Sequence, residues 1–184
     1  WGLLGAPMRR YLGVLALFAL ARASETFILL LGHERGAATV ELLLLWAMLN
    51  FAKAVTATLG GRLSDRFGRA AVIVASSGAF ALSFALLGAA RTPLALWLAT
   101  VLYGLLAGAG EGAERAVVAD FARPAERGTA FGWYNLTVGV LVLPANLFFG
   151  WLWDAFGQKA AFLSAASFAL AGALALFLFN PAPL

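Results

Sequence analysis

Residues 40–89 read VELLLLWAMLNFAKAVTATLGGRLSDRFGRAAVIVASSGAFALSFALLGA, two long apolar runs on either side of the polar segment Gly61–Arg69. Each run has about 20 residues, the length at which an α-helix crosses the hydrocarbon core of a bilayer. The runs are continuous and do not alternate with polar residues, which argues against the strands of a membrane barrel. This stretch predicts two membrane helices joined by a short polar turn.

Four further runs of the same kind flank this pair and are joined to it by short connections. The six predicted spans are Arg10–Leu31, Val40–Leu59, Ala70–Ala89, Pro93–Val118, Thr129–Trp153 and Ala160–Phe179. No connection is long enough to separate soluble domains. We therefore expect an all-α membrane protein, with residues 1–184 forming a single six-span domain in the lipid bilayer.

The composition excludes several classes of protein. Of 184 residues, 62 % are hydrophobic and 12 % charged, against about 45–50 % and about 25 % in soluble domains. With no cysteine and one histidine, disulfide frameworks, zinc–thiolate sites and multi-histidine metal sites are excluded. The basic residues lie in short loops between apolar runs, which argues against a nucleic-acid partner.

No enzyme or cofactor signature is present either. An intramembrane serine protease needs a histidine base within the membrane, whereas His33 lies in a predicted loop and no G-x-S-G turn occurs. His33 and Glu34 are expected in a solvated loop. The phosphate-binding pattern G-x-x-x-x-G-K-[ST] is also missing, which argues against direct ATP driving. We predict no catalytic residues, no metal and no cofactor.

The distribution of Lys and Arg predicts the orientation in the membrane, because cytoplasmic loops carry an excess of both. With a cytoplasmic N-terminus, seven basic residues face inward and three face outward. The inward set is Arg9, Arg10, Arg62, Arg66, Arg69, Arg123 and Arg127, and the outward set is Arg35, Arg91 and Lys159. We expect a multi-pass protein of the plasma (inner) membrane with both termini in the cytoplasm.

A short pattern occurs twice in the chain. Gly61–Gly68 (GRLSDRFG) and Gly150–Gly157 (GWLWDAFG) both read GxLxDxFG, and each joins the last two spans of a three-span unit. Glu25 and Glu111 occupy corresponding first spans, and Asn50 and Asn135 corresponding second spans. Because three is odd, the second unit enters the membrane inverted, an organisation common in secondary transporters. We expect one repeat over about residues 8–89 and the other over about residues 93–180.

The segment Gly61–Arg69 resembles the loop signature G-x-L-x-D-R-x-G-R of the major facilitator superfamily, with Ala70 where a further basic residue is expected. The likeness extends over nearly the whole chain. It includes Ser24–Phe27, Lys53, Leu105–Asp120, Arg127–Gly132 and Leu143–Ala145, which resemble one bacterial branch of permeases.

The resemblance implies a twelve-span carrier of which this chain is the C-terminal six-helix half, with Trp1–Pro7 as the tail of the central cytoplasmic loop. The expected function is that of a secondary active transporter that moves a small solute by alternating access, with proton coupling through Glu25 or Glu111. The partner is then a second six-helix half, in the same polypeptide or another copy. The alternative is a non-transporting scaffold or a channel subunit.

Ionisable residues within spans are costly and usually face a cavity or a partner. Those of this chain are Arg22, Glu25, Lys53, Glu111, Glu114 and Arg115. Lys53 and Glu111 both precede the end of their spans by about seven residues, at about 10 Å from the cytoplasmic edge, so a contact between them is expected. Arg22 and Glu25 are expected one helical turn apart on one face. The alternatives are proton or substrate coupling and fixed ion pairing.

Within the turn that contains Gly61 and Gly68, the charged residues Asp65, Arg66 and Arg69 are interpreted as a gate. Arg69 is expected to pair with Asp120 or Glu126 in one state and to release it in another. The alternative is a plain positive-inside loop.

The remaining candidates are polar or helix-breaking residues within spans. Gly104, Gly108 and Gly112 share one helix face and favour close helix packing. Pro144 is expected to kink its span, and Asn135 to hydrogen-bond a neighbouring helix or a substrate.

Overall fold

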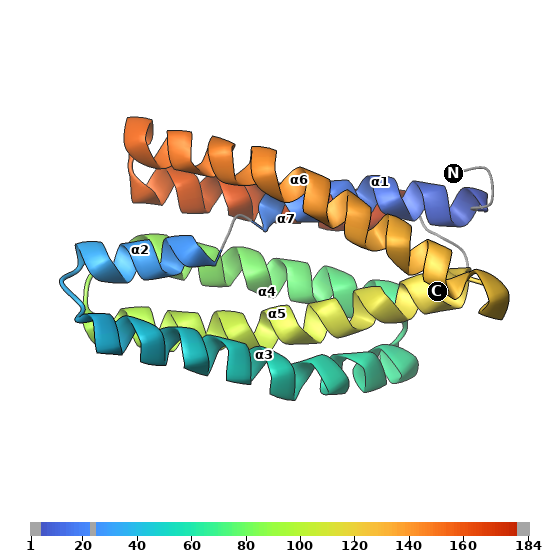
Figure 1. Cartoon of the computed structure of the whole chain (residues 1–184), viewed down its shortest axis with the longest axis horizontal. Helices are drawn as coiled ribbons and strands as arrows, with labels where there is room; N and C mark the ends of the chain where they lie inside the picture. Colours follow the sequence, from blue (N-terminus) through green and yellow to red (C-terminus); the bar gives the residue numbers. More distant parts are fainter. Residues whose placement is uncertain (1–4, 23–24, 180–184) are drawn as a thin grey trace.

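The computed structural model describes residues 5–22 and 25–179 (Figure 1). Within these ranges the chain is helical throughout, with short connections and no strand. The elements are α1 Ala6–Ala21, α2 Thr26–Glu34, α3 Thr39–Phe67, α4 Arg69–Ala89, α5 Pro93–Phe121, the 3₁₀ turn η1 Pro124–Glu126, α6 Arg127–Phe156 and α7 Gln158–Phe179.

The six predicted spans are confirmed by length and hydropathy. Each of six helical stretches contains an 18-residue window of mean hydropathy between 1.6 and 2.1. Five stretches correspond to α3, α4, α5, α6 with η1, and α7, while α1 and α2 together make up the sixth, Ala6–Glu34. The protein is therefore an all-helical, multi-pass membrane protein.

The first span differs from the expected continuous helix Arg10–Leu31. Helix α1 ends at Ala21, Arg22 has a non-helical ψ of 57°, and α2 begins at Thr26. Arg22 and Glu25 thus do not share a helical face, because each lies at a helix end and has its own partner, as described below. Ser24, part of the family-like segment, and residues 1–4 lie outside the described ranges, as does residue 180 at the end of the expected second repeat.

Two glycines replace the longer turns that the sequence suggests. Gly68, with φ of 90°, separates α3 from α4, and Gly157, with φ of 83°, separates α6 from α7. L-residues with a side chain rarely adopt this left-handed region. The expected loops Gly60–Arg69 and Asp154–Lys159 are therefore mostly helical, and both GxLxDxFG segments end a helix in the same way.

In Figure 1, helices α1, α6 and α7 lie along one side of the bundle, and α2, α3, α4 and α5 lie along the other. Helix α3 lies along α5, α4 packs between α5 and α7, and α1 packs against α6 and α7. Buried apolar side chains of the described residues form two clusters. One, containing Leu49, Phe84 and Phe162, lies toward the α2 end of the bundle, and the other, containing Leu15 and Val117, lies toward the Gly68 end. The charged residues of the spans occupy the border between these clusters.

Helix α5 approaches α3 closely at its glycine face. A Cβ atom on Gly104 would lie 2.9 Å from the Leu49 carbonyl oxygen, and one on Gly108 would lie 2.8 Å from the Cα of Lys53. From the α3 side, a Cβ on Gly60 would lie 2.5 Å from the Cα of Ala109. These distances are too short for real Cβ atoms, so the predicted role of the glycines in helix packing is confirmed.

We predict that Gly108→Ala lowers the thermal stability of the chain in detergent, because the added Cβ meets the α3 backbone. Overpacking of this kind costs about 1–3 kcal/mol. Gly139→Ala on α6 is the matched control, because a Cβ there has open space around it. The midpoint of thermal unfolding, followed by the monodisperse peak in size-exclusion chromatography, reports the difference. Equal midpoints for the two variants would contradict the close α3–α5 contact.

Candidate functional site

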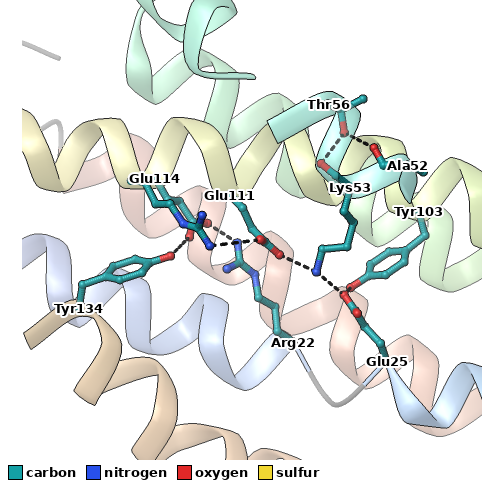
Figure 2. Close-up of polar contacts among 10 residues, drawn as sticks. Arg22, Glu25, Ala52, Lys53, Thr56, Tyr103, Glu111, Glu114 and Tyr134 are labelled. Carbon is teal, nitrogen blue, oxygen red and sulfur yellow. Dashed lines mark hydrogen bonds and ion pairs between the residues drawn. The ribbon is translucent and has the colours of Figure 1, made fainter. Parts of the chain in front are cut away.

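The Lys53 ammonium group lies between the carboxylates of Glu25 and Glu111 (Figure 2). Its Nζ atom is 2.7 Å from Oε1 of Glu25, which precedes α2, and 2.8 Å from Oε1 of Glu111 on α5. The predicted contact between Lys53 and Glu111 is present, and Glu25 is a second partner that the depth estimate did not provide. One ammonium group thus joins two carboxylates from separate helices. Lys53, Glu25 and Glu111 are the Lys53 cluster.

Arg22 forms a separate ion pair with Glu114 of α5. The Glu114 side chain is 2 % exposed, and its second oxygen accepts a hydrogen bond of 3.4 Å from the hydroxyl of Tyr134 on α6. Lone buried charges are costly, so Arg22 and Glu114 hold each other in place. This pair ties the end of α1 to α5 and α6.

Glu114 is the most enclosed of the charged side chains in the two groups. It is 2 % exposed, whereas Arg22 is 25 % exposed and Lys53, Glu25 and Glu111 are between 17 % and 23 % exposed. Arg115 lies on the outside of the cluster, 62 % exposed, with its guanidinium 3.9 Å from Glu111. The arrangement therefore places one enclosed carboxylate, Glu114, beside a group of partly exposed charged side chains.

Two tyrosines complete these contacts and were not identified from the sequence. The Tyr103 hydroxyl donates a hydrogen bond of 3.0 Å to Oε1 of Glu25, and Tyr134 donates to Glu114. A buried phenol usually needs a hydrogen-bond partner. The only signal in the sequence is a tyrosine inside an apolar span, which does not indicate its distant partner.

A small cavity lies beside the Arg22–Glu114 pair. Its volume is about 20 Å³, about enough for one water molecule. Ser76, Ser77 and Gly110 line it together with the two charged side chains. No group of three or more His, Cys, Asp or Glu side chains suited to a metal ion occurs within the described ranges.

Arg69 is the centre of a second group of polar contacts, at the Gly68 end of the bundle. Its Nε lies 2.8 Å from Oδ2 of Asp120 at the end of α5, and its guanidinium also pairs with Asp65 and donates a bond of 2.6 Å to Ser64. The expected pairing with Asp120 is present, whereas Glu126 pairs with Arg123 instead. Ser64, Asp65, Arg69 and Asp120 are the Arg69 cluster.

The other gate residues lie around this cluster. The Gly61 carbonyl accepts a bond of 3.4 Å from Arg69, and Gly68 provides the turn between α3 and α4. The Arg66 guanidinium lies 5.3 Å from the centre of the Phe67 ring.

Asn135 and Pro144 are not part of either cluster. Both are exposed residues of α6, and the contacts described above do not involve them. Helix α6 continues through Pro144 from Arg127 to Phe156, and the bend expected there stays a prediction.

Ionisable side chains within membrane-length helices are typical of proteins that carry solutes, ions or protons across a membrane. The family model described as the Major Facilitator Superfamily matches residues 11–184. The chain therefore belongs to the major facilitator superfamily, a family of membrane transporters.

Individual proteins show the same likeness. The puromycin resistance protein pur8 of Streptomyces alboniger is 42 % identical over 82 residues, covering 44 % of this chain and 16 % of that protein. An uncharacterized MFS-type transporter of Methanocaldococcus jannaschii is 26 % identical over 180 residues, covering 93 % of this chain and 44 % of that protein.

Among solved structures, the human organic anion transporter MFSD10 (TETRAN) matches with a TM-score of 0.77 at 20 % identity. The match covers 92 % of this chain and 40 % of that chain, and it shows a shared fold. The chain thus spans less than half the length of each of these proteins.

We predict that Arg22→Met lowers stability strongly, because it leaves the enclosed Glu114 carboxylate without its cationic partner. Breaking a buried pair costs about 3–5 kcal/mol. The double variant Arg22→Met with Glu114→Leu recovers most of that loss, and the exposed Arg115→Gln is a control with little effect. Thermal midpoints in detergent measure all four proteins. A double variant that is no more stable than Arg22→Met alone would show that Arg22 and Glu114 are not coupled.

Proposed function

We propose that the chain forms half of a secondary active carrier that moves a small organic solute by alternating access, with the Lys53 cluster as its proton-coupled centre. The observation that carries this proposal is the position of one ammonium group between two carboxylates on separate helices. When α2 and α5 move relative to α3, Lys53 retains one carboxylate and releases the other. The released carboxylate then binds a proton or a cationic group of the solute.

The Arg69 cluster supports the gating part of the proposal. It ties the turn between α3 and α4 to the end of α5, and thus joins the two three-helix units at one end of the bundle. Asp65 and Asp120 are 62 % and 47 % exposed. Ion pairs this close to solvent are individually weak, so they can form in one state and break in another.

The packing of the helices supports two inverted repeats. In the two repeats, α1 and α2 correspond to α5, α3 corresponds to α6, and α4 corresponds to α7. When each helix is replaced by its counterpart, the main helix–helix contacts are preserved. The α3–α5 contact becomes α6–α1, α4–α5 becomes α7–α1, and α4–α7 is unchanged. Matching neighbours under this exchange are expected when two copies of one unit are related by a two-fold axis.

A second six-helix half is the proposed partner. The chain covers 44 % and 40 % of the two proteins that it matches along nearly its whole length. Helices α3 and α6 expose large apolar side chains, among them Leu43, Phe51, Val140 and Leu147. The second half and lipid together would cover these faces, with both termini in the cytoplasm of a plasma-membrane protein.

We predict that Lys53→Met reduces the amount of folded protein more than Glu25→Gln or Glu111→Gln does. Loss of Lys53 leaves two carboxylates without their cation, whereas loss of either acid leaves Lys53 paired. The triple variant restores the amount, because all three charges are gone. Lys159→Met, which removes the other lysine at the start of α7, is the matched control.

The same variants test transport in the carrier that contains both six-helix halves. Proteoliposomes containing a pH-sensitive dye receive puromycin or a fluorescent organic anion, two solute types suggested by the relatives' names. We expect solute-dependent proton movement in the parent, and none in Glu111→Gln or in the triple variant. Full transport by the triple variant would make the cluster a structural clamp. No flux in the parent with any solute tested would favour a scaffold.

The orientation has its own test, because the chain contains no cysteine. Single cysteines in place of Arg66 and Arg123 should react with a membrane-impermeant maleimide only from the cytoplasmic side, and one in place of His33 only from outside. All three residues are exposed. Labelling of the Arg66 position from outside would reverse the proposed topology.

A further inference from the structure

A third group of polar contacts lies at the α2 end of the bundle, opposite to the Arg69 cluster. Glu34, the last residue of α2, accepts a hydrogen bond of 3.1 Å from Nε1 of Trp153 on α6 and another from Nε2 of Gln158, the first residue of α7. Arg35 donates a bond of 3.0 Å to Oε1 of Gln158. Glu34 is thus not confined to a solvated loop. Glu34, Trp153 and Gln158 are the Glu34 cluster.

The internal repeat relates this cluster to the Arg69 cluster. The register that places Gly61–Gly68 on Gly150–Gly157 also places Ser64 on Trp153 and Arg69 on Gln158. At one end of the bundle, Arg69 donates hydrogen bonds to Ser64 and to Asp120. At the other end, the corresponding residues Trp153 and Gln158 both donate to Glu34.

Two carboxylates of the first repeat also align with two carboxylates of the second repeat. The alignment that places Glu25 on Glu111 also places Glu34 on Asp120. In both cases a carboxylate at the end of the unit's first span lies nine residues after a carboxylate of the Lys53 cluster. Asp120 is on the same helix as Glu111, and Glu34 closes the short helix that Glu25 precedes.

We propose that the Glu34 cluster is a second latch, which holds α2 and thereby positions the Glu25 carboxylate against Lys53. This inference rests on the proposed carrier function, and it assigns one latch to each carboxylate that Lys53 contacts. The Arg69 cluster holds the helix that carries Glu111, and the Glu34 cluster holds the helix that follows Glu25.

The surroundings of the cluster favour this role. Trp153 is buried, and its ring lies 5.7 Å from the rings of Phe27 and Phe162. Its indole N–H is therefore a fixed donor, whereas Glu34 is exposed and Gln158 is half-buried. Helix α2 has nine residues, of which Ile28 and Leu31 are buried in the apolar core, and the polar contacts at its end add a second attachment to this apolar one.

The two latches differ in charge. Arg69 brings a cation to two carboxylates, whereas Trp153 and Gln158 offer neutral donors to one carboxylate. The cation at this end of the bundle, Arg35, donates its hydrogen bond to Gln158. Asp154 stands in the position of Asp65, so Gln158→Arg would provide the ion-pair partners that Arg69 has.

Distances between spin labels test the proposal on the full chain in lipid nanodiscs. One label pair replaces His33 and Ala155, at the ends of α2 and α6, and a second pair replaces Arg62 and Arg123, at the other end of the bundle. All four positions are exposed, and no native cysteine interferes. The variants are Glu34→Ala, Gln158→Arg and the control Asp154→Ala, an exposed acid at the same end.

We expect Glu34→Ala to broaden and lengthen the distance distribution between positions 33 and 155, and to leave that between 62 and 123 unchanged. Gln158→Arg should narrow the first distribution, and Asp154→Ala should alter neither. An unchanged first distribution in Glu34→Ala, or equal broadening at both ends, would overturn the latch, since general loosening affects both ends alike.

Solute flux then separates this proposal from the proposed function. If the distances respond as expected and Gln158→Arg also slows solute-dependent proton movement, both the second latch and the carrier function are supported. If the distances respond but the parent carrier moves no solute, the contact holds α2 while the carrier function fails. If the parent moves solute and the distances do not respond, the carrier stands and the second latch is wrong.

Discussion

The close approach of α3 and α5 is the constraint on which the charged centre depends. Where α5 has glycine at Gly108, the α3 backbone at Lys53 lies too close for a Cβ atom. This contact brings Lys53 within reach of Glu111, one turn further along α5, while its ammonium also reaches Glu25. A larger residue on the glycine face would move α3 outward and separate Lys53 from Glu111. The position of the Lys53 charge therefore depends on the close packing of α3 against α5.

The break in the first span, between α1 and α2, is consistent with the different ion-pair partners of Arg22 and Glu25. Arg22 and Glu25 have different partners, Glu114 and Lys53, and a continuous helix would hold them on one face. Ending α1 at Ala21 and starting α2 at Thr26 separates the Arg22–Glu114 pair from the Lys53 cluster. Arg22 and Glu25 can then each contact its own partner.

Much of the fold could be predicted from the sequence, because six apolar runs of membrane length have few alternatives. The Lys53–Glu111 contact followed from equal depth along two spans, and Arg69–Asp120 from charges at neighbouring span ends. Tyr103, Tyr134 and the contacts of Trp153 and Gln158 with Glu34 were missed, because each joins residues far apart in the sequence and leaves no local periodicity. The break after Ala21 was missed for a related reason, since its apolar flanks look like one continuous run.

The most direct test of the central claim, that Lys53 lies between Glu25 and Glu111, is nuclear magnetic resonance of the lysine side-chain nitrogens. The chain has two lysines, Lys53 and Lys159, so Lys159→Arg leaves a single signal from ¹⁵N-labelled lysine in nanodiscs. The bridging arrangement predicts that Glu25→Gln and Glu111→Gln each shift this signal, and that Glu41→Gln does not. A signal that responds to neither Glu25→Gln nor Glu111→Gln would contradict the proposed centre.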